Sequence, residues 1–112
     1  MSDQKPAART RFGYVAQHRP DFAKAFGAYF RAAYDPENPV LEKRERVLIY
    51  LAVLASVGAV EGFRTHLRDA HAAGLSEAAV LEAVLTAVPA VGYPRVMDVM
   101  EVLSGYSDLE SA

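Results

Sequence analysis

The feature that most constrains the fold is an apolar segment, residues 47–60, which is interrupted only by Ser56 and Gly58. The segment is shorter than the roughly 20 residues that a membrane-spanning helix needs, so it predicts a buried helix. A chain of 112 residues buries a limited share of its surface, and a helix that is apolar on nearly every side is hard to cover within one such protomer. The segment therefore predicts that the protein associates with itself.

The overall composition is that of one globular domain. Hydrophobic residues make up 52% of the chain and charged residues 23%, so we expect a single domain over residues 1–112, with residues 1–11 flexible. Acidic and basic residues are interspersed and the net charge is -2, which leaves no broad positive field for a nucleic acid or an anionic membrane. Residues 1–11 are polar and do not resemble a secretory signal, so we expect a cytoplasmic protein.

Helix start and stop signals recur along the chain and predict an all-α fold of about five to six helices. Pro20 and Asp21 suit a helix N-terminus, and the two prolines in residues 35–39 predict a loop after a helix that ends near Ala33. Further helices are expected over residues 41–55, from Glu61 to a stop at Gly74, from an N-cap at Ser76 to a stop at Pro89, and from residue 94 to 104.

Four aromatic residues of the first expected helix recur at three- and four-residue spacings and form a stripe on one face: Phe22, Phe26, Tyr29 and Phe30. Such a stripe is more often core packing than a shelf for a ligand. We therefore expect these side chains to be buried.

Four short motifs occur in a defined order: residues 41–46 (LEKRER), 65–70 (THLRDA), 72–77 (AAGLSE) and 92–94 (GYP). Their order and spacing resemble the carboxymuconolactone decarboxylase and alkylhydroperoxidase D-like superfamily over roughly residues 20–103. The resemblance implies a small alkylhydroperoxidase D-like helical domain. It also implies a ring-shaped homo-oligomer, a trimer or a hexamer.

The chain departs from the redox members of that superfamily at the positions of their reactive groups. Ala59 and Gly62 stand where those members have two cysteines, and Val47 stands where they have an acidic residue. The chain has no cysteine at all, which excludes thiol peroxidase chemistry. The decarboxylase branch is therefore the closer comparison, and it implies cofactor-free action on a small unsaturated lactone acid.

His66 is the first catalytic candidate, because the resemblance retains it and an imidazole can donate or accept a proton near neutral pH. A structural role for a lone histidine on a packed helix is an equally good interpretation. Glu61 is the second candidate, although its three-residue spacing from Arg64 favours a local ion pair. Metal binding is not expected, because His66 and His71 diverge by about 140° around a helix and no third ligand converges with them.

A carboxylate substrate needs a cationic anchor, and arginine suits that task. Arg46 matches the family's arginine and lies one turn before Tyr50, so the two side chains could face a pocket together. A surface ion pair of Arg46 with Glu42 or Glu45 is the alternative. Arg64 is a further substrate-binding candidate.

Two functions remain open from the sequence. The first is a cofactor-independent decarboxylase or related lyase, with His66 as proton donor and an arginine holding the substrate. The second is a non-catalytic oligomer that keeps the fold and binds or responds to a small organic acid. Family likeness alone does not decide between them, because function resides in the site.

Overall fold

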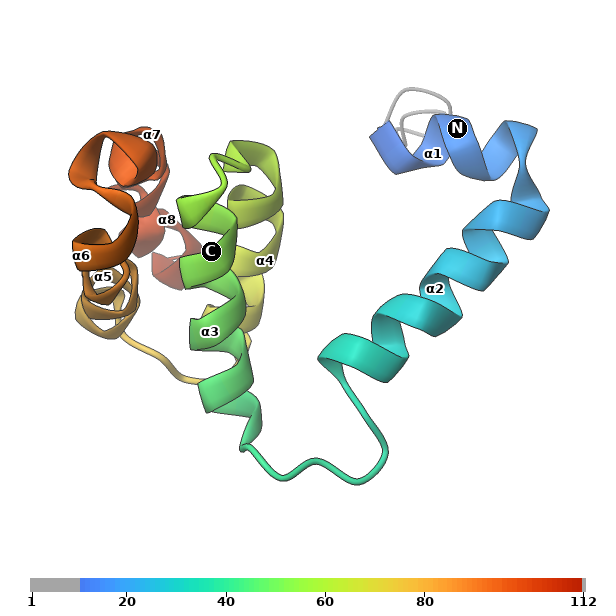
Figure 1. The fold of residues 1–112 in the computed structure, drawn as a ribbon, viewed down its shortest axis with the longest axis horizontal. Coiled ribbons are helices and arrows are strands. Elements are labelled where there is room, and N and C mark those ends of the chain that lie inside the picture. The colour runs from blue at the N-terminus through green and yellow to red at the C-terminus, as the bar shows by residue number, and fades with distance from the viewer. Residues whose placement is uncertain (1–10, 112) are drawn as a thin grey trace. The chain divides into compact units, whose positions relative to one another are not determined.

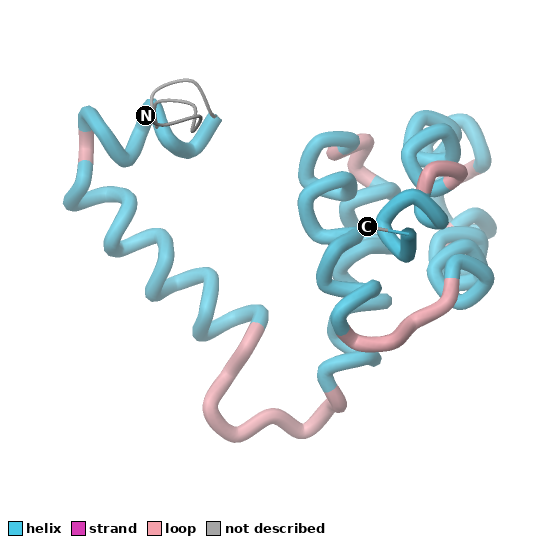
Figure 2. Tube along the Cα trace, turned by 180° about the vertical axis from the view of Figure 1, so that it is seen from behind, coloured by secondary structure: helices cyan, strands magenta, loops and turns pink. Residues whose placement is uncertain are grey.

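The structure is a computed structural model, and it describes residues 11–111. Within that range the chain forms eight helical segments, six of them with eight residues or more, and no strand (Figures 1 and 2). The predicted all-α fold of about five to six helices is thus confirmed. The chain divides into two compact units, residues 1–40 and 41–112. The prediction that residues 1–11 are flexible falls outside the described range except for Arg11, which begins α1.

The first unit contains α1 (Arg11–His18) and α2 (Pro20–Tyr34). Pro20 lies in the first turn of α2, where its missing N–H costs no hydrogen bond. The guanidinium of Arg19 donates two hydrogen bonds to the Asp21 carboxylate, at 2.9 and 2.8 Å. These bonds lower the pKa of Asp21. The start of α2 and its end one residue after Ala33 agree with the sequence pattern.

The aromatic stripe of α2 is present, but the expectation that it is buried as core packing is not met within this unit. Phe26 contacts the rings of Phe22, Tyr29 and Phe30, and also that of Phe12 from α1 at a centroid distance of 5.6 Å. No residue of α2 is buried, and Tyr29 is 67% exposed. The periodicity gave the shared face correctly, but periodicity alone does not say what covers that face.

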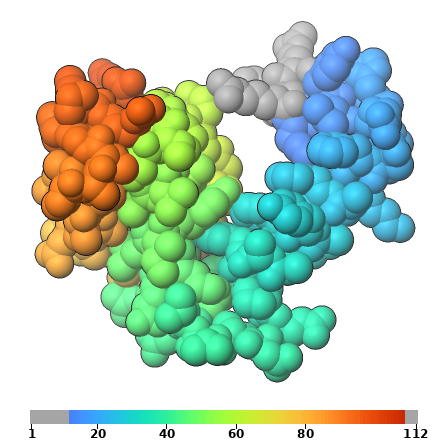
Figure 3. All heavy atoms as spheres, in the orientation of Figure 1, coloured from blue at the N-terminus to red at the C-terminus, as the bar shows by residue number. Residues whose placement is uncertain are grey.

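The second unit is a bundle built around α3 (Lys43–Ser56) and α4 (Val60–Ala72), with α5 (Glu77–Thr86) and α7 (Tyr93–Leu103) packed against them. Figure 3 shows the side chains of α3, in green, packed against those of the C-terminal helices, in orange. The core consists of Val47, Leu51, Ala55, Phe63, Leu67, Ala70, Leu75, Val80, Val84, Val96, Val99, Leu103 and Tyr106. The apolar segment of the sequence thus supplies the buried face of α3.

Local signals set most helix ends in this unit. Gly58 and Gly74 have φ angles of 73° and 76°, in the left-handed region that ends helices most readily at glycine. The Ser76 side chain accepts a hydrogen bond from the backbone N–H of Ala79 at 3.1 Å, so the predicted N-cap of α5 is confirmed.

Two features of the C-terminal part differ from expectation. Helix α5 already ends at Thr86, and Pro89 lies in the first turn of a separate short helix, α6 (Val88–Val91). A proline is tolerated in a first turn, so it marks a new start here instead of the predicted stop. Helix α8 (Tyr106–Ser111) was not predicted. Tyr106 is fully buried and fixes this last helix to the bundle.

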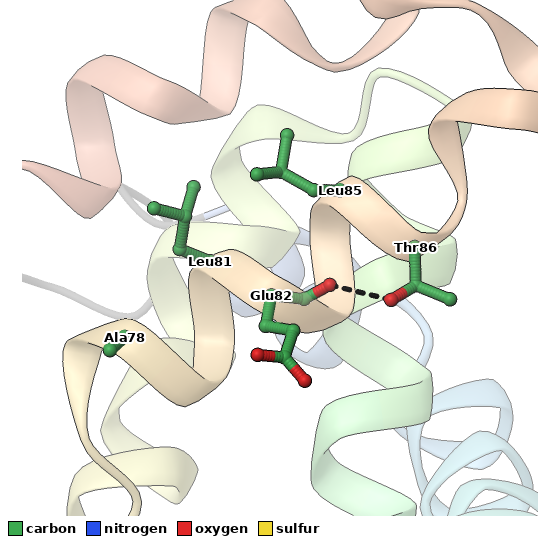
Figure 4. Close-up of a pocket in the computed structure, with 5 residues that line it drawn as sticks. All are labelled: Ala78, Leu81, Glu82, Leu85 and Thr86. Atoms are coloured by element: carbon green, nitrogen blue, oxygen red, sulfur yellow. Dashed lines mark hydrogen bonds between the residues drawn. The ribbon is translucent and has the colours of Figure 1, made fainter.

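An apolar part of the bundle surface is not covered by the second unit itself. Ile49 and Val53 of α3 are about half exposed, at 52% and 51%. They line a shallow hollow of about 330 Å³ between α3 and α5, together with Leu48, Ala52, Ala83, Thr86 and Ala87. A second hollow lies along α5, where Leu81 and Leu85 project from the helix and Thr86 donates a hydrogen bond to the Glu82 carbonyl at 2.7 Å (Figure 4). Among the residues described, no helix is both long and apolar enough to cross a membrane.

Candidate functional site

His66 lies in the middle of α4, on the border between its buried and exposed faces. Its neighbours Phe63 and Leu67 point into the core, and Glu61 and Arg64 are exposed. The His66 side chain itself is 21% exposed. An imidazole in this position is held by packing on one side and remains in contact with solvent.

Asp69, one turn further along α4, is the acidic partner of His66. The imidazole Nδ1 and the carboxylate Oδ2 lie 2.9 Å apart. The three-residue spacing places both side chains on one face of the helix. An ionised carboxylate only accepts hydrogen bonds, so the contact suits an imidazole that has a proton on Nδ1.

Tyr50 of α3 is the third member of the cluster. Its ring lies edge-on to the His66 imidazole, with centroids 4.9 Å apart and an angle of 79° between the planes. Burial raises the pKa of the Tyr50 hydroxyl above 10.0, and the negative charge of Asp69 raises it further. The phenol therefore stays protonated well beyond neutral pH and remains a hydrogen-bond donor.

The other predicted site residues have partners of their own. The Arg46 guanidinium donates to the backbone carbonyl of Leu41, which lies two residues before the start of α3. Glu61 and Arg64 form an exposed ion pair with a nitrogen to oxygen distance of 3.4 Å, as their spacing favoured. The structure thus brings His66 together with Tyr50, and it gives Glu61 a different neighbour.

Asp69 is the residue that sequence reasoning missed. It belongs to the motif 65–70, and its spacing from His66 was a sufficient signal for a helical pair.

The comparison with known families decides the membership of this chain. The model of the carboxymuconolactone decarboxylase family matches residues 20–104, which is most of the sequence. The chain belongs to the carboxymuconolactone decarboxylase family. No curated protein and no solved structure matches it at a significant level.

Within this carboxymuconolactone decarboxylase fold, the departures from the redox relatives are parts of the packing. Val47 is fully buried in the core of the bundle, and Ala59 is the N-cap residue of α4. A Cβ on Gly62 would lie only 3.1 Å from the Cδ2 of Leu54. These three positions contribute to helix packing and bring no reactive group to the site.

The described part of this family member holds no cluster of three or more histidine, cysteine, aspartate or glutamate residues that could bind a metal. His71, the other histidine of α4, lies edge-on to the ring of Tyr106 at a centroid distance of 6.3 Å. It therefore belongs to the contact with α8, while His66 faces Tyr50.

Proposed function

We propose that this member of the carboxymuconolactone decarboxylase family is a cofactor-independent lyase that acts on a small lactone carboxylic acid. The observation that carries the proposal is the cluster of His66, Asp69 and Tyr50. It combines a proton-exchanging imidazole, a carboxylate that holds it and a protonated phenol, on two neighbouring helices. General acid catalysis at an unsaturated acid needs a group of this kind.

Decarboxylation of such a substrate breaks the bond between the carboxylate carbon and the adjacent ring carbon. The carboxylate leaves as CO₂, and the bonding electron pair passes into the unsaturated ring as an enolate. The protonated imidazole of His66 then gives its Nε2 proton to carbon, and water restores that proton. The Tyr50 hydroxyl supplies a hydrogen bond for the developing negative charge, because its raised pKa keeps it protonated.

Of the two candidate anchors for the substrate carboxylate we favour Arg46, whose guanidinium also donates to the Leu41 carbonyl. It precedes Tyr50 by four residues in α3, so both side chains emerge from the same face of the helix. Arg64 precedes His66 by two residues in α4, so it points away from the imidazole, and it pairs with Glu61. We therefore assign carboxylate binding to Arg46.

The proposal is tested by incubating the purified full chain with carboxymuconolactone and measuring the CO₂ released. His66→Gln should lower kcat by at least about 100-fold, the usual contribution of a general acid. His18→Gln is the matched control, because His18 is an exposed histidine of α1, and it should leave the rate unchanged. An unchanged rate of CO₂ release by His66→Gln would refute the proposal.

A second candidate is a non-catalytic protein that binds a small organic acid. The observation in its favour is that Glu61, the acid predicted to assist His66, pairs with Arg64. Isothermal titration calorimetry with the same lactone acid distinguishes the two functions. Binding that weakens in Arg46→Ala, without any release of CO₂ by the wild-type chain, would establish this second function.

We also propose that the protein forms a homo-oligomer, a trimer or a hexamer. The half-exposed side chains of Ile49 and Val53, and the hollow between α3 and α5, support an interface there. Light scattering coupled to size exclusion tests the idea. Val53→Lys should yield a smaller species, whereas Val40→Lys, at a position 99% exposed, should not. A monomeric wild-type chain would refute the proposal.

A further inference from the structure

The contact between His66 and Asp69 has a consequence for the protonation of the imidazole. A neutral imidazole carries one proton, either on Nδ1 or on Nε2, and the hydrogen bond at one nitrogen selects the form. The Asp69 Oδ2 lies 2.9 Å from Nδ1. Because an ionised carboxylate cannot donate, the contact favours the proton on Nδ1 and leaves the lone pair on Nε2.

Tyr50 restrains the same ring from a second helix. Its edge-on contact at 79° limits the rotation of the imidazole about its Cβ–Cγ bond, which would otherwise exchange the positions of the two ring nitrogens. The two restraints are independent, since one comes from α4 and the other from α3. Together they define both the orientation and the tautomer of His66.

We propose that Asp69 is the positioning residue of this site: its carboxylate fixes the Nδ1–H tautomer of His66, so that Nε2 is the nitrogen that exchanges a proton with substrate. The kinetic part of the inference rests on the proposed function, whereas the tautomer is a property of the protein without substrate. Asp69 acts through His66 and has no contact with the reacting carbon in this assignment. Its carboxylate also stabilises the imidazolium that exists before the proton is given to carbon.

The tautomer is measured directly by the ¹⁵N shifts of the imidazole in labelled protein, in alkaline solution where an ordinary imidazole is neutral. The His66 resonances are assigned from their absence in His66→Gln. We expect a protonated Nδ1 and an unprotonated Nε2 in the wild-type chain, and a shift towards the Nε2–H form in Asp69→Ala. An unprotonated Nδ1 in the wild-type chain, or identical spectra in Asp69→Ala, would overturn the inference.

Three further variants make the test specific. Asp69→Leu keeps a side chain of similar size and removes both the charge and the hydrogen-bond acceptor, and it replaces Asp69→Ala in the comparison if the alanine variant does not fold. Asp69→Glu keeps the carboxylate and should restore the Nδ1–H tautomer. Asp98→Asn makes the same change in charge at an exposed position of α7 and should leave the His66 resonances unmoved.

Kinetics with carboxymuconolactone provide the second measurement. Asp69→Asn should lower kcat by at least about tenfold, with KM within about twofold of wild type, since the substrate is held elsewhere. Asp69→Glu should recover most of the loss. If the wild-type chain shows no activity, the proposed function fails, and the ¹⁵N spectra still decide the role of Asp69. An active enzyme that is indifferent to Asp69→Asn would refute the positioning role alone.

Discussion

The hydroxyl of Tyr106 donates a hydrogen bond of 2.7 Å to the backbone carbonyl of Leu75, 31 residues earlier in the chain, and the bond is buried. Leu75 lies in the connection between α4 and α5, whereas Tyr106 begins α8. The bond therefore joins the C-terminal helix to the middle of the bundle. It also satisfies a backbone carbonyl at a point where the chain leaves a helix.

Tyr106→Phe should destabilise the second unit by about 1 to 3 kcal/mol, because the Leu75 carbonyl loses its partner in a buried place. Urea unfolding followed by circular dichroism, at one fixed protein concentration, measures the change. Tyr29→Phe is the control, since Tyr29 is largely exposed, and its midpoint should stay at the wild-type value. Equal midpoints for all three proteins would show that the buried hydrogen bond adds nothing to stability.

Ser76→Ala should cost about 1 kcal/mol, because the backbone N–H of Ala79 loses the side-chain oxygen that caps α5. The same unfolding measurement applies. Ser76→Asp keeps a side-chain acceptor at this position and should retain wild-type stability. Equal unfolding midpoints for Ser76→Ala and Ser76→Asp would contradict the capping role of Ser76.

Gly74→Ala should destabilise the chain by about 1 to 2 kcal/mol, the cost of placing a Cβ in left-handed backbone. Gly27→Ala is the matched comparison in a helical position. There the new Cβ would meet the Arg31 guanidinium at an ordinary van der Waals distance of 3.5 Å. Alanine is the better helix former, so Gly27→Ala should not lower the unfolding midpoint. A loss at Gly27 that matched the loss at Gly74 would contradict the backbone explanation.

The tyrosine titration should contain a late contribution from Tyr50. Burial first, and the charge of Asp69 second, raise the pKa of Tyr50 above 10.0. The folded chain thus holds this proton more tightly than the unfolded chain does. The resulting stabilisation is complete below pH 10.0 and is lost as the pH rises through the folded value.

Ultraviolet absorbance of tyrosinate measures this contribution among the six tyrosines of the chain. The contribution of Tyr50 is the difference between the titrations of the wild-type chain and Tyr50→Phe. It should move to lower pH in Asp69→Asn, because the second of the two causes is then removed. A difference centred at or below the ordinary tyrosine value would contradict the raised pKa of Tyr50.

The helices could be predicted from the sequence where a local signal determines them. Pro20, Gly58, Gly74 and Ser76 act through their own backbone or side-chain chemistry, and the structure has each at the expected helix end. The effect of Pro89 was harder to predict, because proline both stops a helix and suits the first turn of the next one. Helix α8 depends on a tertiary contact of Tyr106, which no local pattern reveals.

The candidate site was predicted in part. His66 and Tyr50 were both named from the sequence, and the structure places their rings in contact across two helices. Asp69 could have been found from its spacing, since a pair three residues apart on one helix needs no tertiary information. The exposure of the aromatic stripe on α2 could not be predicted from the sequence. Periodicity identifies residues that share a helix face, but it does not show whether another element packs on that face.

The packing around Val47 and Gly62 also bears on whether this fold could be given thiol chemistry. Introducing it would need more than two cysteine substitutions. A side chain on Gly62 would press against Leu54, and an acid at position 47 would place a charge in the centre of the core. Either of these two substitutions made alone would thus strain or charge the packed interior, so the bundle would have to repack before it could hold a thiol site.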